Sequence, residues 1–434
     1  MHSLQKQFHD YVEERDLLRN NEKILLAVSG GLDSMAMCHL FLHAPWTFSV
    51  AHCNFNLRGE ESEGDEYFVR KWGEKNSIEV HTQSFDLGEG SIQQNARKAR
   101  YKWFAELCDE FDYTRIVTAH HLNDSLETTL INLTRGTGIK GITGIPVQLG
   151  NIIRPLLFAS KKQLRDYAEE EGIEWREDST NARTDYDRNL IRHEVIPKLL
   201  ELNPSLTDTF YHTSERLNLT NKVFQARVDE IRKDNLRVEE ACIKLNLDWI
   251  SGHTDLVILA EILSEYGFNY ATAREIFEAA GKSGKQFPLE SVTASMDRNA
   301  LFIKKNEEQK HEELLVESEG TYEFRNRQIR LSMEPKGDDP IPKNPLEECF
   351  DAEKIQFPLT LRKWREGDRF RPLGMKGSKK ISDYLIDKKV PLALKDDVLV
   401  LTTQHEIIWL VGHQISDDYK VTTSSKEILS VKLD

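Results

Sequence analysis

The chain has 434 residues, of which 39% are hydrophobic and 30% are charged. At about 150 residues per domain this length allows two or three domains, and no apolar run approaches the roughly 18 residues needed to cross a membrane. The net charge of 58 − 72 = −14 argues against indiscriminate binding of polyanions but leaves room for local basic patches.

The amino-terminal residues contain no basic segment that leads into an apolar one, so we expect a cytoplasmic protein with no membrane partner. The five cysteines are widely spaced and include no Cys-x-x-Cys pair. This spacing favours reduced thiols and gives no motif for a disulfide framework, a zinc site or an iron–sulfur cluster.

The first two hundred residues alternate short apolar runs with amphipathic stretches, a pattern typical of a parallel sheet crossed by helices. The expected strands are 23–29, 48–52, 78–85, 115–119 and 152–157, and the expected helices are 33–43, 60–76, 92–111 and 123–135. We therefore expect an α/β fold in which residues 1–212 form one domain with a doubly wound parallel sheet.

Strand signals fade beyond residue 213, where residues 221–234 and 255–266 carry apolar side chains at helical spacing. The charge run at 304–319 predicts a solvated helix or linker rather than an interaction surface. Residues 213–345 are therefore expected to form a small, mostly helical domain followed by a linker.

Residues 321–333 alternate in polarity as a hairpin does, and turn-forming residues follow them up to Pro345. Beyond this linker the clearest strands are 398–402 and 406–411. We expect an α+β C-terminal domain at residues 346–434.

The expected first strand runs directly into Ser29, Gly30, Gly31, Leu32, Asp33 and Ser34, and then into a helix. Adjacent glycines let the backbone approach a phosphate, and the helix N-terminus offers unpaired N–H groups. A carboxylate here would repel a bare phosphate, so Asp33 indicates a divalent cation, Mg²⁺, that bridges to the phosphates. The loop is neither a Walker A loop nor a dinucleotide fingerprint. It predicts a nucleotide site, with a serine-capped helix after a glycine turn as the alternative.

Further candidates follow the second and fourth strands, where a parallel sheet presents its ligands. Arg58 could hold a phosphate or a carboxylate, or could be an exposed loop arginine. Asp124 and Glu127 share one helical face and could hold a metal, a substrate ammonium or a proton, or could simply be solvated. Arg188 and Arg192 lie one helical turn apart and could face a triphosphate or an RNA backbone, or water.

The Ser29–Ser34 loop resembles the S-G-G-x-D-S loop of the PP-loop ATP pyrophosphatases, which split ATP into AMP and pyrophosphate while activating a carbonyl oxygen. The motifs after it are H-x-N-x-x-L-R at 52–58, H-H-x-x-D-x-x-E-T at 120–128, R-G-T-G at 135–138, D-S-T-N at 178–181 and R-N-x-x-R-x-x-x-x-P at 188–197. In this order they resemble the tRNA(Ile)-lysidine synthase family. Residues 367–384 resemble the C-terminal domain of the same family.

Three positions depart from the family pattern. The helix usually reads H-H-x-D-D-Q-x-E-T, whereas Asn123 and Ser125 stand at the first Asp and at the Gln. Phe55 stands where a second histidine is common. The family's roles are therefore not carried over to these positions.

The resemblance implies a ligase that forms a carbon–nitrogen bond. ATP adenylates the carbon-2 oxygen of the wobble cytidine in the CAU anticodon of tRNA(Ile), and the ε-amine of free L-lysine displaces AMP, which changes decoding from AUG to AUA. Residues 213–345 and 346–434 would contact the tRNA, and residues 1–212 would bind ATP. The sequence does not decide the oligomeric state, and a homodimer stays open.

The resemblance also implies roles for single residues. The Ser29–Ser34 loop would cradle the phosphates, and Asp33 would hold Mg²⁺. Asp124 and Glu127 are candidates for catalytic carboxylates or for binding the lysine amine. Arg192, with Arg188 second, would neutralise charge on the phosphates. The remaining candidates for phosphate or substrate binding are Arg58 and His120.

A local basic excess supports the resemblance independently. Residues 362–395 contain eleven Lys and Arg against four Asp and Glu, or 11 − 4 = +7. An RNA contact is favoured over a solvated face because glycines and aromatic residues are interleaved with the charges. The candidates for tRNA binding are Arg369, Arg371, Lys376, Lys379 and Lys380.

Two other functions remain as alternatives. Another PP-loop tRNA modifier, such as a cytidine thiolase, would usually carry a cysteine pair that this chain lacks. In the second alternative, a non-catalytic ATP-sensing RNA-binding protein, the carboxylates of the loop would have no catalytic function. ATP/pyrophosphate exchange that depends on tRNA would separate these classes.

Overall fold

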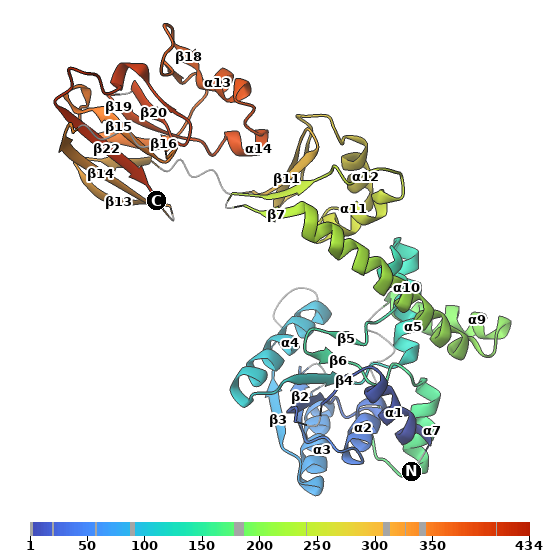
Figure 1. Cartoon of the computed structure of the whole chain (residues 1–434). Helices are drawn as coiled ribbons and strands as arrows, with labels where there is room; N and C mark the ends of the chain where they lie inside the picture. Colours follow the sequence, from blue (N-terminus) through green and yellow to red (C-terminus); the bar gives the residue numbers. More distant parts are fainter. Residues whose placement is uncertain are drawn as a thin grey trace. The chain divides into compact units, whose positions relative to one another are not determined.

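The computed structural model divides the chain into two compact units, Met1–Gln225 and Ala226–Asp434 (Figure 1). The structure describes residues 3–19, 21–56, 59–86, 92–177, 186–239, 241–306, 313–325, 327–337, 344–404 and 406–434. None of the helices within these ranges is both long enough and apolar enough to cross a membrane.

The N-terminal unit is built on a six-stranded sheet in the order β3-β2-β1-β4-β6-β5. Its strands are β1 (Ile24–Ala27), β2 (Phe48–Asn54), β3 (Val80–Ser84), β4 (Arg115–Thr118), β5 (Gln148–Leu149) and β6 (Ile152–Ile153). β1 pairs in parallel with β2 and β4, so that Leu25 stands opposite Ser49 on one side and Ile116 on the other. Only the short edge strand β5 runs antiparallel, to β6, among the described strands of this sheet. The expected parallel sheet is confirmed.

Helices cover both faces of this sheet, as a doubly wound fold requires (Figure 1). They are α1 (Ser3–Glu14), α2 (Leu32–Leu42), α3 (Glu60–Asn76), α4 (Ile92–Phe111) and α7 (Lys161–Glu170). The unit also contains α5 (Leu122–Arg135) and α6 (Ile139–Ile142). One core joins Phe8 of α1, Phe41 of α2 and Tyr167 of α7, and a second gathers around Trp103 and Phe104 of α4. The sequence predicted α2 to α5 but missed α1 and α7, because each has few apolar residues beyond its buried stripe.

A run of helices follows the sheet. It consists of α8 (Tyr186–Leu190), a π-helical turn (Ile191–Val195), α9 (Ile196–Leu202) and α10 (Leu206–Asn235). Ile191, Ile196 and Phe210 pack with Leu122 and Leu126 of α5. This packing ties the helices that follow the sheet to the helix that follows β4.

The second unit begins with an antiparallel sheet in the order β7-β8-β11-β10-β9. Its elements are β7 (Leu236–Val238), β8 (Ile243–Asn246), α11 (Asp255–Ser264), α12 (Tyr270–Glu278), β9 (Gln286–Pro288), β10 (Val292–Asp297) and β11 (Ala300–Lys305). The helices expected at 221–234 and 255–266 are present as part of α10 and as α11, but the sequence predicted neither α12 nor the sheet beside these helices. Its outer strands have three residues each, too few to show the alternation of polarity that marks a strand.

Two further antiparallel sheets follow, β12-β16-β19-β20-β21 and β13-β14-β22-β15. Their strands are β12 (Glu313–Val316), β13 (Gly320–Phe324), β14 (Arg327–Pro335), β15 (Glu347–Asp351), β16 (Leu359–Lys363), β19 (Leu399–Thr403), β20 (Glu406–Leu410), β21 (Gln414–Ile415) and β22 (Glu427–Leu433). Their facing sides share one core that contains Phe350, Leu401 and Trp409. The predicted hairpin at 321–333 and the strands at 398–402 and 406–411 are confirmed.

The charge run at 304–319 departs from its prediction in its described part. Residues 313–316 form β12 rather than a helix, because Val316 is buried and the strand pairs with β16. β14 likewise pairs with β22. Strands on both sides of the expected boundary at residue 345 therefore lie in the same sheets, and the domain boundaries drawn from the sequence stay predictions.

Candidate active site

The PP-loop joins β1 to α2 and is held by its own serines. The Ser34 hydroxyl donates to the Gly31 carbonyl at 2.9 Å, and the Ser29 and Ser34 hydroxyls lie 3.2 Å apart. Gly30 has φ +87°, a conformation that side chains rarely adopt. No side chain caps the first turn of α2, so its N–H groups are free to bind an anion.

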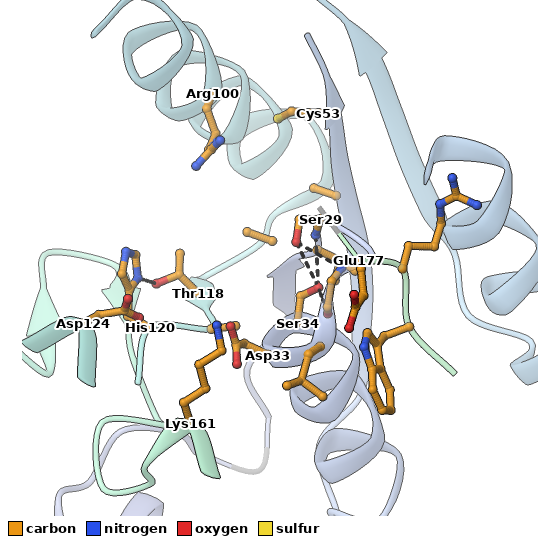
Figure 2. A pocket seen from close by; sticks show the side chains of 18 of the residues that line it. Ser29, Asp33, Ser34, Cys53, Arg100, Thr118, His120, Asp124, Lys161 and Glu177 are labelled. Atoms are coloured by element: carbon orange, nitrogen blue, oxygen red, sulfur yellow. Dashed lines mark hydrogen bonds between the residues drawn. The ribbon is translucent and has the colours of Figure 1, made fainter. Parts of the chain in front are cut away.

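A pocket of about 640 Å³ opens above this loop (Figure 2). It is lined by Ser29, Asp33 and Ser34 of the PP-loop region, by Cys53 of β2 and by Thr118 of β4. The other walls come from α4, α5, α7 and the segment 175–177. The parallel pairing of β1, β2 and β4 explains this arrangement, because their carboxyl ends meet at one edge of the sheet.

Asp33 has the features of a cation ligand. Its Oδ1 is buried and has no hydrogen-bond partner among the described residues, while its Oδ2 lies 3.6 Å from Nε2 of His121. The described residues contain no cluster of three or more His, Cys, Asp or Glu side chains that could hold a metal ion. A cation at Asp33 would therefore take its other ligands from phosphate and water, which is how Mg²⁺ is usually bound in nucleotide sites.

Asp124, in the first turn of α5, borders the same pocket. One of its oxygens accepts the backbone N–H of His121 at 3.0 Å, and the other lies 3.6 Å from the Arg192 guanidinium. Burial acts to raise the pKa of this carboxyl, but His121, His120 and Arg192 outweigh burial and lower it. Asp124 is therefore an anion at neutral pH, suited to bind a substrate ammonium.

Glu127 is placed differently from Asp124, although the two share one helix. Its side chain is 2% exposed and does not line the pocket. Arg192 donates to both of its oxygens, at 2.6 and 2.9 Å, and Nε of Arg188 lies 3.3 Å from Oε2. Glu127 thus holds the two arginines, of which Arg188 borders the pocket and Arg192 does not. The hydrogen bond to Glu127 raises the pKa of Arg192.

His120 lines the pocket and is neutral at physiological pH. Burial is the largest cause that lowers its pKa, to about 4, and Arg154 and Arg188 act in the same direction. Nδ1 of this ring lies 2.9 Å from the Thr118 hydroxyl. A neutral imidazole at this place can donate or accept a hydrogen bond without adding charge.

The two residues of α5 that break the family pattern both make hydrogen bonds to distant segments of the chain. Oδ1 of Asn123 accepts the backbone N–H of Lys161 at 2.9 Å, which ties α5 to the start of α7. Oγ of Ser125 accepts the backbone N–H of Ile145 at 3.0 Å. These bonds give Asn123 and Ser125 a structural task that the sequence could not show.

Part of the expected site lies outside the described residues, namely Arg58 and the D-S-T-N motif at 178–181. In contrast, the structure adds pocket residues that the sequence analysis missed. They are Arg100, Tyr101, Phe104, Lys161, Arg165, Trp175, Arg176 and Glu177. The backbone N–H of Arg176 donates to the Gly30 carbonyl at 3.0 Å, and its guanidinium pairs with Asp65. No local motif marks these residues, since distant segments bring them to the loop.

Comparison with known proteins agrees with this geometry. Residues 1–199 match the family model of a PP-loop domain, residues 238–306 that of the TilS substrate binding domain, and residues 359–432 that of the TilS substrate C-terminal domain. The tRNA(Ile)-lysidine synthase of Bacteroides thetaiotaomicron is 35% identical over 99% of this chain and 100% of its own length. The chain belongs to the tRNA(Ile)-lysidine synthase family.

Other known proteins are also similar to this chain. The tRNA(Ile)-lysidine synthase of Parabacteroides distasonis is also 35% identical, over 97% of this chain and 98% of its own. Among solved structures, the U34-tRNA thiolase NcsA from Methanococcus maripaludis with its [4Fe-4S] cluster has a TM-score of 0.42 and 17% identity, over 49% of this chain and 78% of its own. That similarity is too distant to distinguish functions.

The basic patch of this lysidine synthase family member lies around β17 (Arg369–Phe370), β18 (Lys379–Lys380) and α13 (Ile381–Asp387). Several of its cations are already paired within the chain: Arg371 with Asp417 and Asp418, and Lys379 with Asp387. Arg369 donates to the Ser378 hydroxyl at 3.1 Å. Lys376 and Lys380 are exposed and make no ion pair within the described part of the chain.

The ion pairs of Glu127 with Arg188 and Arg192 predict that Glu127 stabilises the fold. Glu127→Ala removes the buried carboxylate that pairs with Arg188 and Arg192. The free energy of unfolding should fall by about 3 kcal/mol, which is the lower end of the range for breaking a buried ion pair. The lower end is expected because both arginines are partly exposed to solvent. Denaturant unfolding measures this loss. The exposed Glu74→Ala on α3 is the control. A loss in Glu127→Ala no larger than that of the control would contradict the prediction.

His120 predicts a pH effect. Its pKa is about 4 in the folded chain and 6.5 ordinarily. Between pH 4 and pH 6.5 the His120 imidazole binds a proton in the unfolded state but not in the folded state. The stability of the folded chain therefore falls as the pH falls from 6.5 towards 4, whereas above pH 6.5 His120 makes it no weaker. His120→Gln should therefore flatten the decline of unfolding free energy over this range. Chemical denaturation at several pH values tests this, and parallel curves for both proteins would refute it.

Proposed function

We propose that this chain ligates L-lysine to carbon 2 of the wobble cytidine in the CAU anticodon of tRNA(Ile). The observation that carries the proposal is the alignment of a protein named tRNA(Ile)-lysidine synthase over 99% of the chain, both the PP-loop pocket and the C-terminal sheets included. A cytoplasmic location suits this proposed substrate.

The reaction has two halves. In the first, the carbon-2 oxygen of cytidine forms a bond to the α-phosphorus of ATP, and the bond to the bridging oxygen breaks, so that pyrophosphate leaves with the electron pair. In the second, the deprotonated ε-amine of lysine forms a carbon–nitrogen bond at carbon 2. AMP then leaves with the activated oxygen and the electron pair of the broken carbon–oxygen bond.

The PP-loop would bind the pyrophosphate portion of ATP through the N–H groups of α2 and the hydroxyls of Ser29 and Ser34. Asp33 would hold Mg²⁺, since its buried Oδ1 lacks a partner. When bound, Mg²⁺ would neutralise part of the phosphate charge and favour the departure of pyrophosphate.

Asp124 is the proposed partner of the lysine ammonium, because it is an anion that lines the cavity. Glu127, which the sequence analysis offered for the same task, would act through the arginines that it holds. Of these, Arg188 is the better placed to face the phosphates, since it borders the pocket. His120, being neutral, would contribute hydrogen bonds to the substrate.

The direct test incubates the full chain with ATP, Mg²⁺, labelled lysine and each tRNA that carries a CAU anticodon. Label should enter tRNA(Ile) and not tRNA(Met), and AMP and pyrophosphate should form with it. Transfer of sulfur in place of lysine would support the thiolase alternative, and tRNA binding without ATP turnover would support the non-catalytic one.

Asp33→Asn should reduce lysine incorporation by at least about 100-fold, because the lost charge removes the cation from the phosphates. The thermal midpoint should stay close to that of the wild type, since the Asp33 side chain is 30% exposed and its distance to Nε2 of His121 is as long as 3.6 Å. The exposed Asp109→Asn on α4 serves as the control. Near-normal turnover in Asp33→Asn would contradict the role of Asp33 as the ligand of Mg²⁺.

Lys376→Ala combined with Lys380→Ala should weaken tRNA binding and lower the slope of log affinity against log salt by roughly 0.7 to 0.9 for each lost phosphate contact. Lys336→Ala with Lys426→Ala removes equal charge from exposed positions outside the patch and should leave the slope unchanged. Filter binding over a salt series measures both. Equal slopes for the two double variants would show that the patch is only a solvated surface.

A further inference from the structure

Lys161, the first residue of α7, has no role in the sequence motifs but lines the PP-loop pocket. Its position on the helix directs it inward. Residues 161, 164 and 168 lie on one helical face, and Leu164 and Ala168 on that face are fully buried. Lys161 itself is half-buried, whereas its neighbour Lys162 is exposed and does not line the pocket.

The backbone at Lys161 is anchored to the site. Its N–H donates to Oδ1 of Asn123, one residue before Asp124. At the preceding position, Ser160 and Gln163 exchange hydrogen bonds that cap α7, at 2.8 and 3.2 Å. The base of the Lys161 side chain is therefore held to α5, the helix that carries the proposed lysine-binding carboxylate.

Lys161 forms no ion pair within the described part of the chain. Other cations that line the pocket are engaged: Arg176 with Asp65, Arg188 with Glu127, and Arg100 over the ring of Phe55 at 5.4 Å. The Lys161 ammonium makes no hydrogen bond or ion pair to any described residue. A half-buried cation that forms no ion pair gains stabilisation from an anionic ligand that does pair with it.

The direction of the side chain indicates which anion it meets. In Figure 2 the Lys161 side chain ends beside Asp33, on the side of His120 and Asp124. The N–H groups of α2 lie at the loop itself, where pyrophosphate would bind. The space between that loop and Asp124 would hold the next phosphate, at which the cytidine oxygen attacks.

We propose that the Lys161 ammonium binds a non-bridging oxygen of the α-phosphate, in ATP and in AMP alike. The inference deepens the proposed function and rests on it for the orientation of ATP. A lysine suits this position because a single compact charge can follow an oxygen that moves as the phosphorus changes its bonds. An interaction that strengthens as charge builds on that oxygen raises kcat more than it lowers the KM for ATP.

The test compares Lys161→Met, which keeps length and removes charge, with Lys161→Arg and with Lys162→Met as the matched control. Calorimetric titration of the full chain with ATP, AMP and pyrophosphate, each with Mg²⁺, gives three affinities per variant. Lys161→Met should bind ATP and AMP roughly 10- to 100-fold more weakly and pyrophosphate unchanged, as expected for one lost charged hydrogen bond. Lys161→Arg should recover part of the loss, and Lys162→Met should bind like the wild type.

Two results would overturn the proposal. One is unchanged AMP affinity in Lys161→Met, whether or not pyrophosphate binding falls. The other is the same loss in Lys162→Met, which would indicate a diffuse effect of charge. Thermal melting of each variant verifies folding, and Lys161→Arg carries the comparison if Lys161→Met does not fold.

Failure of the proposed function gives a different pattern. A wild-type chain that binds ATP but transfers no lysine to tRNA(Ile) would refute the ligase reaction and leave the nucleotide affinities readable. A Lys161→Met chain that incorporates lysine with wild-type kcat and KM would refute the role of Lys161 and leave the ligase reaction standing.

Discussion

The parallel pairing of β1 with β4 is the constraint on which the site depends. Because Leu25 stands opposite Ile116, the PP-loop after β1 and the start of α5 after β4 emerge at the same edge of one sheet. The phosphate-binding loop and the Asp124 carboxylate thereby face one pocket. Helices α1, α2, α3, α4 and α7 pack on the faces of the sheet, and α4 and α7 also supply walls of that pocket.

Positive charge is concentrated at two places in an otherwise acidic chain. The overall charge is −14, yet the pocket brings five described arginines and lysines together, and residues 362–395 carry a local excess of +7. Internal carboxylates hold several of these cations in place, as Glu127 and Asp65 do at the pocket and Asp417 does at the patch. The positive charge is therefore concentrated at fixed points, which suits binding of chosen phosphates rather than of any polyanion.

Sequence patterns reveal local features and miss those assembled from distant segments. The strands of the N-terminal sheet and the Ser29–Ser34 loop could be predicted because their signals, short apolar runs and adjacent glycines, come from residues that are neighbours in the sequence. The inward direction of Lys161 could have been found only if the short apolar stripe of α7 had been recognised. No sequence pattern indicated the pairing of Glu127 with Arg192, because 65 residues separate them. The same holds for β7 and β9, whose three residues show no period.

The bond from the Arg176 amide to the Gly30 carbonyl bears on how the protein is made. It comes from a segment that the ribosome adds long after β1, so a nascent chain that ends before residue 176 has the serine contacts of the PP-loop but lacks this bond. The full set of contacts at Gly30 therefore forms only after every strand of the sheet has been synthesised.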